Sequence, residues 1–281
     1  MPLLRPPRAR VGGLPLFPLR DIHLPDLQPS GRHPLPDLHR RDRGRNDQRV
    51  KRKLVLFDID GTLLLSAGAG RRAIHAALAE RGVDVARTAG IRFDGKTDPQ
   101  IIIELLATSG ATVSADSARV TELLALYLSH LERDLEWNGR RSTVMPGILA
   151  LLDALEADEG VLLGLLTGNV ATGARLKLKA AGIDPGRFRV GAFGSDHHAR
   201  SELAPVAARR AEPHFGRVPD GREVVIIGDT PADVSCGACI GARTIAVATG
   251  GYTVAELEAT GADHVFADFS DVERATEAIL S

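Results

Sequence analysis

Apolar residues follow two alternating patterns between residues 53 and 281. Short apolar runs predict buried strands, and stretches with apolar residues at helical spacing predict helices. Because the two kinds of segment alternate, with Gly and Pro between them, we predict an α/β fold with a Rossmann-like parallel sheet and helices on both faces. The expected strands span residues 53–58, 161–166, 223–227, 244–247 and 264–266, and the expected helices span about 147–158, 171–181, 201–212, 231–240 and 253–260.

Residues 66–144 depart from this alternation, because they show helical spacing and no clear strand. A helical segment placed directly after the first strand predicts an inserted all-helical cap domain over the end of the sheet. The α/β catalytic core then comprises residues 51–65 and 145–281. Within the cap, we expect Trp137 and the Leu-rich helix around residues 120–131 to lie in the apolar core.

Residues 1–50 lack apolar periodicity and contain nine of the sixteen prolines. Such a segment cannot bury enough apolar surface to offset the entropy of ordering it, so we predict a disordered, Pro- and Arg-rich extension. Residues 1–53 carry 13 Lys or Arg and 5 Asp, a net charge of +8, whereas the whole chain carries −1. The remainder is therefore acidic, which argues against a nucleic-acid partner, because duplex binding depends on clustered Lys and Arg.

The two cysteines, Cys236 and Cys239, form a single CxxC pair with no second pair and no nearby His. This pattern does not predict a zinc site, and we expect both cysteines to pack as small apolar residues in a helix. No apolar stretch reaches the roughly 18–20 residues of a membrane span, and the first residues lack the apolar core of a secretory signal. We therefore expect a cytoplasmic location without a membrane partner, and we make no prediction of the oligomeric state.

Acidic and hydroxyl side chains stand at the ends of three predicted strands. Asp58 and Asp60 follow the first, Thr167 ends the second, and Asp229 and Asp233 follow the third. Open α/β proteins place their chemistry at such strand ends. Two carboxylates one residue apart suit one nucleophile and one proton carrier, and the later aspartates suit Mg²⁺. The hydroxyl of Thr167, together with the amides of a following helix, suits a phosphate group.

Some of these strand-end residues also have a purely structural interpretation. Thr167, taken alone, fits an N-cap of the next helix. Thr230 or Asp229 fits an N-cap of a helix that has Pro231 in its first turn, and this role is compatible with a metal site beside it.

The chain resembles the haloacid dehalogenase superfamily, specifically its phosphatases with a helical cap inserted after the first motif. The resemblance covers roughly residues 53–281 and rests on three segments in the family's order, Asp58-Ile59-Asp60-Gly61-Thr62, Thr167-Gly168-Asn169 and Gly228-Asp229-Thr230-Pro231-Ala232-Asp233. Within the cap, Gly95-Lys96-Thr97-Asp98 resembles a cap loop of phosphoglycolate-phosphatase-like members.

The resemblance implies that Asp58 is the nucleophile and forms an aspartyl-phosphate. Asp60 is then expected to protonate the leaving oxygen and afterwards to deprotonate the attacking water. Mg²⁺ is expected as the cofactor, held by Asp58, the carbonyl of Asp60 and Asp229, with Asp233 bound to it or close by.

The remaining implied site residues contact the substrate. Thr167 is expected to act in catalysis, and Gly168 and Asn169 are expected to bind the phosphate. Lys96 is the candidate cation for the far end of the substrate. The implied activity is Mg²⁺-dependent hydrolysis of a small phosphorylated metabolite, with 2-phosphoglycolate as a candidate.

The chain departs from the family in one position. The family usually has a Lys-Pro pair before the helix that precedes its last motif, but residues 197–205 contain no lysine. We expect Arg200 to supply the missing cation as a catalytic residue; the alternative is that Arg200 is solvated and that His197 or His198 compensates. Lys177 and Lys179 lie on a predicted helix and are expected to be exposed to solvent.

Two other functions remain open from the sequence. A sugar phosphomutase of the same superfamily would pass the phosphoryl group to a sugar instead of water. A binding protein with this fold would have lost catalysis together with the motif lysine.

Overall fold

Six strands form one parallel sheet in the computed structural model, which describes residues 53–88, 90–138 and 142–281. The strand order is β5-β4-β1-β6-β7-β8. The chain runs outward from β1 through β4 to β5 and then returns to the other side of β1 with β6. In sheets of this kind, ligands bind beyond the carboxyl ends of the strands, at the point where the order of the strands reverses. The strands are β1 (Lys53–Phe57), β4 (Val161–Thr167), β5 (Val190–Phe193), β6 (Val224–Gly228), β7 (Arg243–Val247) and β8 (His264–Phe266).

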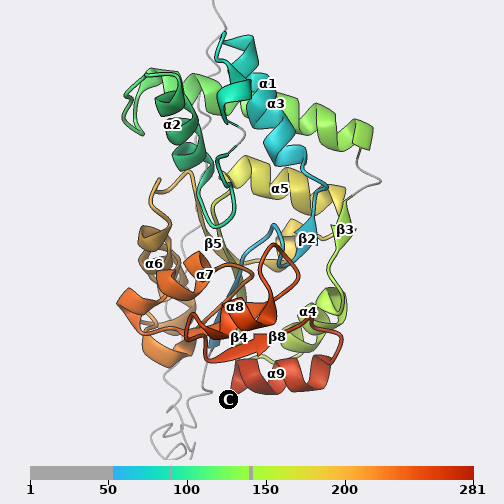
Figure 1. Cartoon of the computed structure of the whole chain (residues 1–281). Coiled ribbons are helices and arrows are strands. Elements are labelled where there is room, and N and C mark those ends of the chain that lie inside the picture. Colours follow the sequence, from blue (N-terminus) through green and yellow to red (C-terminus); the bar gives the residue numbers. More distant parts are fainter. Residues whose placement is uncertain (1–52, 89, 139–141) are drawn as a thin grey trace, which may run out of the picture. The chain divides into compact units, whose positions relative to one another are not determined.

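Helices cover both faces of the sheet, because its central strands present apolar side chains to both (Figure 1). In β1, Val55 and Phe57 join one buried apolar cluster, and Leu54 and Leu56 join another. This follows from the alternation of side chains along a strand. The helices of the first cluster are α4 (Ile148–Glu156), α5 (Ala171–Ala180) and α9 (Val272–Leu280); those of the second are α6 (Leu203–Phe215) and α7 (Pro231–Cys236). A short helix, α8 (Val254–Glu258), connects β7 to β8.

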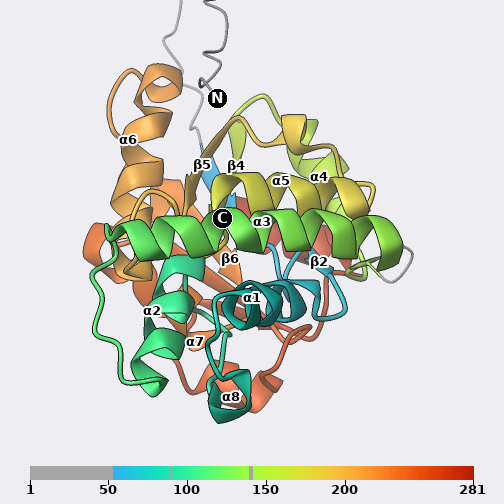
Figure 2. The ribbon, with the colours of Figure 1, turned by 90° about the horizontal axis from the view of Figure 1, so that it is seen from above.

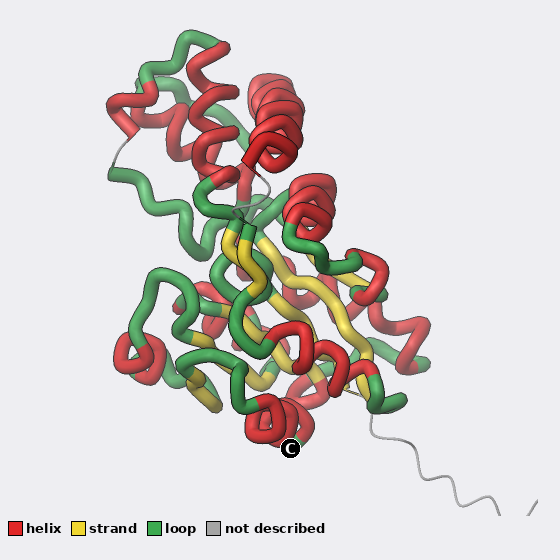
Figure 3. Tube along the Cα trace, turned by 90° about the vertical axis from the view of Figure 1, so that its right-hand side faces the viewer, coloured by secondary structure: helices red, strands yellow, loops and turns green. Residues whose placement is uncertain are grey.

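A further group of helices lies beyond the carboxyl ends of the strands (Figure 3). We call it the helical region; it contains α1 (Ala69–Glu80), α2 (Asp98–Thr108) and α3 (Ala118–Asn138), with a 3₁₀ turn at Val85–Thr88. These helices enclose an apolar cluster of their own, in which Ile74, Leu105 and Tyr127 are almost completely buried. Helix α3 also packs along α5 (Figure 2), so the helical region contacts the layer that carries the sheet.

Two short strands connect the helical region to the sheet. β2 (Leu64–Leu65) leads into it, and β3 (Thr143–Val144) leads back, as an antiparallel pair. The predicted domain boundaries at residues 66 and 144 lie at this pair. That the region is a separate cap domain stays a prediction.

The five predicted strands are confirmed to within one residue, but β5, β2, β3 and α9 were not predicted. The helix expected over residues 231–240 is shorter, because α7 ends at Cys236 and a 3₁₀ turn follows at Ala238–Ile240. The disorder predicted for residues 1–50 concerns residues outside the described ranges. Within those ranges, no helix has the length and apolar character needed to cross a membrane.

The prediction for Trp137 is wrong, because this residue is 90% exposed. The buried face of α3 is formed by Val120, Leu123, Tyr127, Leu131 and Leu135, at steps of three or four residues. Residue 137 follows the last of them by two positions and therefore points away from that face.

Candidate active site

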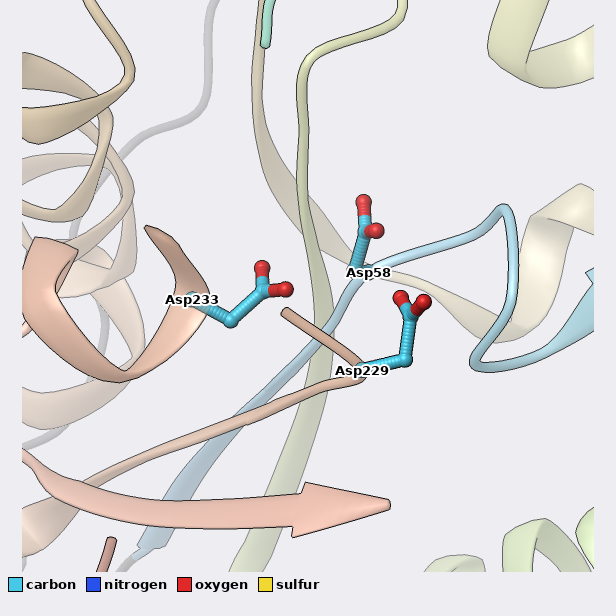
Figure 4. A group of neighbouring side chains, drawn as sticks. All are labelled: Asp58, Asp229 and Asp233. Atoms are coloured by element: carbon cyan, nitrogen blue, oxygen red, sulfur yellow. The ribbon is translucent and has the colours of Figure 1, made fainter. Parts of the chain in front are cut away.

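Three aspartates meet at the carboxyl ends of the central strands (Figure 4). Asp58 directly follows β1, and its N–H donates to the carbonyl of Ile227 in β6 over 2.9 Å, so the sheet fixes its position. Asp229 directly follows β6, and Asp233 lies in the first turn of α7. All three are buried, and one carboxylate oxygen of each lies within 4.8 Å of the others.

This cluster has more negative charge than its surroundings neutralise. Burial raises the pKa of Asp58 to about 6; the Arg200 guanidinium opposes this rise, and the Asp233 carboxylate adds to it. Burial, followed by repulsion from Asp233 and Asp58, raises the pKa of Asp229 well above its ordinary value. The Thr62 hydroxyl lies 3.3 Å from Oδ1 of Asp229, but no Lys or Arg of the described residues forms an ion pair with that carboxylate. A divalent cation with oxygen ligands would fit here.

Arg200 is the cation of this cluster. It lies in a 3₁₀ turn just before α6, and its buried guanidinium places Nη2 3.2 Å from Oδ1 of Asp58. The same nitrogen donates to Oδ1 of Asp233. Its Nε has no hydrogen-bond acceptor among the described residues. The structure therefore places Arg200 beside Asp58, and its role as a catalytic cation stays a prediction.

A second buried cation, Lys177 of α5, lies beside Asp60. Its Nζ donates to Oδ2 of Asp60 and to Oδ1 of Asn169, both over 2.6 Å. Nδ2 of Asn169 donates to Oδ2 of Asp60 over 2.8 Å and to Oγ1 of Thr167 over 2.9 Å. Burial alone would raise the pKa of Asp60, but Lys177 and then Asn169 outweigh this effect and lower it. Asp60 is therefore held as a carboxylate within a network of donors.

The loop that carries Lys96 contacts the loop after β4. The N–H of Asp98 donates to the carbonyl of Gly168 over 2.8 Å, and Oδ2 of Asp98 accepts from the N–H of Val170, also over 2.8 Å. A Cβ at Gly168 would collide with the carbonyl oxygen of Lys96, so this close approach needs a glycine. The helical region is thus joined by hydrogen bonds to the predicted phosphate-binding loop.

The two threonines at strand ends have different roles. Thr230 caps α7, because its Oγ1 accepts from the N–H of Asp233 over 3.3 Å. Oδ2 of Asp233 accepts in return from the N–H and the hydroxyl of Thr230, over 3.0 and 2.6 Å, while its other oxygen contacts Arg200. Thr167 does not cap α5, whose N-cap is Val170 without a side-chain cap bond. The capping interpretation of Thr167 is wrong.

These groups line a cavity of about 220 Å³. On the side of the helical region, Lys96 forms an ion pair with Glu104, and the guanidinium of Arg71 lies 3.9 Å from the ring centroid of Phe93. All predicted site residues line the cavity except Asp233, which accepts a hydrogen bond from Arg200. From the sheet layer and its loops these are Asp58, Asp60, Thr167, Gly168, Asn169, Arg200 and Asp229, joined by Lys177.

The prediction that Lys177 is exposed is wrong, whereas Lys179 is exposed as expected. Helix α5 buries Gly173, Ala174, Lys177 and Leu178 on one face, at steps of one and three residues. The small residues at 173 and 174 were a signal that this face packs closely, and position 177 lies on the same face. Sequence spacing therefore indicated the burial of Lys177 but not its partners.

Two other predictions concern residues near the cavity. Cys236 is buried as expected, but Cys239 is exposed, because it lies beyond the end of α7. The rings of His197 and His198 stack on each other, and neither residue lines the cavity.

A family model and the similar curated proteins point to the same family. A model of the haloacid dehalogenase-like hydrolases matches residues 52–241. The chain is 30% identical over 224 residues to the phosphoglycolate phosphatase of Rhodospirillum rubrum, covering 78% of this chain and 89% of that protein.

Solved structures show the same fold. A hydrolase from Pseudomonas syringae superposes with a TM-score of 0.61 at 23% identity, covering 82% of this chain and 99% of that one. CbbY from Rhodobacter sphaeroides, crystallised in complex with phosphate, has a TM-score of 0.61 at 19% identity and covers 78% of this chain and 96% of its own.

Proposed function

The chain belongs to the haloacid dehalogenase-like hydrolases, and we propose that it is a Mg²⁺-dependent phosphomonoesterase acting on a small phosphorylated metabolite. The observation that carries the proposal is the meeting of Asp58, Asp229 and Arg200 at one cavity. A buried carboxylate with a cation beside it can act as the nucleophile. Such a nucleophile divides the hydrolysis of an ester into two phosphoryl transfers, with an aspartyl-phosphate between them.

Mg²⁺ would be held by the carboxylates of Asp58 and Asp229 and by the backbone carbonyl of Asp60. The buried carboxylate of Asp229, which forms no ion pair with a described Lys or Arg, supports this assignment, because oxygen ligands are those that Mg²⁺ prefers. Bound there, the ion would shield the approach of the phosphate to Asp58 and stabilise charge on the transferred group. Asp233 lies close by and mainly holds Arg200, since Thr230 engages its other oxygen.

In the first transfer, a carboxylate oxygen of Asp58 attacks phosphorus, and the bond from phosphorus to the ester oxygen breaks. The leaving oxygen takes a proton from Asp60. Because Asp60 is a carboxylate before substrate binds, it obtains this proton from the ester itself, which binds as the monoanion. Arg200 and Thr167 bind oxygens of the transferred group, and the unpaired Nε of Arg200 supports this role.

In the second transfer, water attacks the phosphorus of the aspartyl-phosphate and gives a proton to Asp60. The bond from phosphorus to Asp58 then breaks, inorganic phosphate leaves, and Asp60 releases its proton to solvent. Despite burial, Lys177 and Asn169 lower the pKa of Asp60, which favours the release of this proton.

The cavity also suggests a class of substrate. Its volume of about 220 Å³ fits a small metabolite, and two cations, Arg71 and the Glu104-paired Lys96, line it from the helical region. 2-Phosphoglycolate combines a phosphate with a carboxylate, and the named relative from Rhodospirillum rubrum supports it as the first candidate. In this proposal residues 66–144 act as a cap, and the protein works in the cytoplasm without a nucleic-acid or membrane partner.

The test is the release of inorganic phosphate from 2-phosphoglycolate and from a panel of sugar phosphates, with Mg²⁺ and with EDTA. We expect release that requires Mg²⁺ and that falls about a thousandfold or more in Asp58→Asn, because the nucleophile is lost. Asp220→Asn is the matched control, since the side chain of Asp220 is 83% exposed.

Three outcomes would contradict the proposal in different ways. Phosphate release that Asp58→Asn leaves unchanged would exclude Asp58 as the nucleophile. Transfer of the phosphoryl group to a second sugar would favour the phosphomutase. Binding of phosphorylated ligands without turnover would favour the binding protein.

A further inference from the structure

Lys177 contacts a group that the proposed chemistry uses, although no motif of the sequence contains it. Its side chain is 5% exposed, and its ammonium lies 2.6 Å from Oδ2 of Asp60. Oδ2 also accepts from Nδ2 of Asn169 and so has two close donors. Among the described residues, Oδ1 of Asp60 accepts only from the hydroxyl of Ser66, over 3.4 Å. The two oxygens are thus held unequally, and Oδ1 is the one left to exchange a proton.

The helical region encloses the same ammonium. A Cβ at Gly70 in α1 would lie 3.2 Å from Nζ of Lys177, so α1 approaches the ammonium closely where its side chain is a single hydrogen. Asp98, at the start of α2, is buried within electrostatic reach of Lys177. Asp98 also accepts from the N–H of Val170 in the loop that carries Asn169. Lys177 therefore lies where the sheet layer and the helical region meet.

A buried ammonium is costly unless carboxylates and hydrogen-bond acceptors surround it. For Lys177 these are Asp60 and Asn169 on the sheet side and Asp98 on the other. Arg200 cannot replace it, because the guanidinium contacts Asp58 and Asp233 instead. The site thus has two buried cations with separate partners.

We propose that Lys177 is a positioning residue, which fixes Oδ2 of Asp60 and leaves Oδ1 directed to the ester oxygen while the helical region is docked. The proposal rests on the proposed function. The proton then passes from Oδ1 to the leaving oxygen as the bond between that oxygen and phosphorus breaks. Docking of Gly70 and Asp98 against the ammonium makes this alignment depend on the helical region.

Leaving groups distinguish this role from general support of the fold. The leaving group of an alkyl ester such as 2-phosphoglycolate is a strongly basic alkoxide, which needs the proton. p-Nitrophenolate is a weak base and leaves without one. Loss of alignment at Asp60 therefore slows the alkyl ester more than the aryl ester, and proton transfer by a positioned group is worth about 10²–10⁴ in rate.

The experiment compares kcat and KM of Lys177→Met on 2-phosphoglycolate and on p-nitrophenyl phosphate, with Mg²⁺ present. We expect kcat for the alkyl ester to fall about a hundredfold, kcat for the aryl ester to fall less than about fivefold, and KM to change little for both. Lys179→Met is the matched control on the exposed side of α5 and should behave as the wild type. Lys177→Arg keeps the charge and should recover part of the loss on the alkyl ester.

The outcomes separate this proposal from the one on which it rests. Equal losses on both esters, or no loss, would overturn the role of Lys177 while the wild-type activity confirms a phosphatase. Inactivity of the wild type towards both esters would overturn both proposals. If circular dichroism shows that Lys177→Met is unfolded, Lys177→Arg decides: partial and equal losses on the two esters would overturn the role, and a loss confined to the alkyl ester would support it.

Discussion

The two buried cations of the site differ in the parts of the chain that surround them. Arg200 contacts Asp58 and Asp233, which both belong to the layer that carries the sheet. Lys177 contacts Asp60 on that layer and also lies against Gly70 of the helical region. Arg200 and the proposed nucleophile, Asp58, are therefore paired within the sheet layer, without an ion pair to the helical region.

The proposed proton carrier, Asp60, in contrast contacts Lys177, which lies against both regions. In the proposed mechanism, attack on phosphorus and proton transfer would therefore respond separately to movement of the helical region. Docking would leave the nucleophile unchanged and complete only the alignment of Asp60. Substitutions at the two cations should accordingly have different signatures.

Of the substitutions that compare the two cations and their surroundings, Arg200→Met should have the greatest effect. Arg200→Met leaves the Asp58 and Asp233 carboxylates without their cation and removes donors to the phosphate, so we expect kcat/KM to fall by about 10²–10³. The fall should be similar for alkyl and aryl esters, unlike that of Lys177→Met. Steady-state kinetics on both esters check this, with the half-exposed Arg210→Met as control. A fall confined to the alkyl ester would remove the distinction between the two cations.

A second test concerns Asp98, where burial raises the pKa from 3.8 to about 6 despite the opposing charge of Lys177. The folded protein then keeps a proton between pH 4 and 6 that the unfolded chain has lost, so the free energy of unfolding falls as pH rises through this window. A shift of this size corresponds to about 3 kcal/mol. The free energy of unfolding of Asp98→Asn should therefore rise, relative to that of the wild type, by up to about 3 kcal/mol between pH 4 and pH 7.

Urea unfolding of both proteins at several pH values measures this difference. Lys177, Asp60 and Tyr127 face Asp98 and are present in both proteins, so the comparison isolates the carboxyl group. The exposed Asp220→Asn serves as control. If the difference in free energy of unfolding between the two proteins stays constant with pH, Asp98 ionises normally. The helical region would then have no buried group near Lys177 that titrates in this range.

The weakest effect is expected at Lys96, which lines the cavity from the helical region. Lys96→Ala should raise KM for 2-phosphoglycolate about five- to tenfold, the value of one charge-assisted contact, with kcat nearly unchanged. KM for p-nitrophenyl phosphate, which has no carboxylate, should not change. An equal rise for both esters would mean that Lys96 acts on the phosphate or on the fold instead of on the carboxylate.

Much of the site could be predicted because its residues directly follow buried strands. Asp58, Thr167 and Asp229 are adjacent in space for the same reason that they follow apolar runs in the sequence: β4, β1 and β6 are neighbours. Arg200 was also anticipated, although from a resemblance and not from a strand end. The strand β5 was missed because Val190-Gly191-Ala192-Phe193 is short and interrupted by a glycine.

Lys177 could not be assigned in this way. Whether a lysine on a helix faces solvent or a carboxylate depends on what packs against that face, and its partners lie 117 positions away in Asp60 and across the chain in α1 and α2. The exposure of Trp137 was missed for the opposite reason, since a large apolar residue was assumed to be core although it lies off the apolar face. In both cases, burial or exposure depends on what packs against that face of the helix, and the residue type alone does not predict it.

The most direct test of the central claim is a rapid acid quench of the protein mixed with a radiolabelled phosphate ester and Mg²⁺. We expect label that stays with the protein, is removed by hydroxylamine as an acyl phosphate would be, and is absent from Asp58→Asn. Release of labelled phosphate without any label on the wild-type protein, or equal labelling of Asp58→Asn, would contradict it.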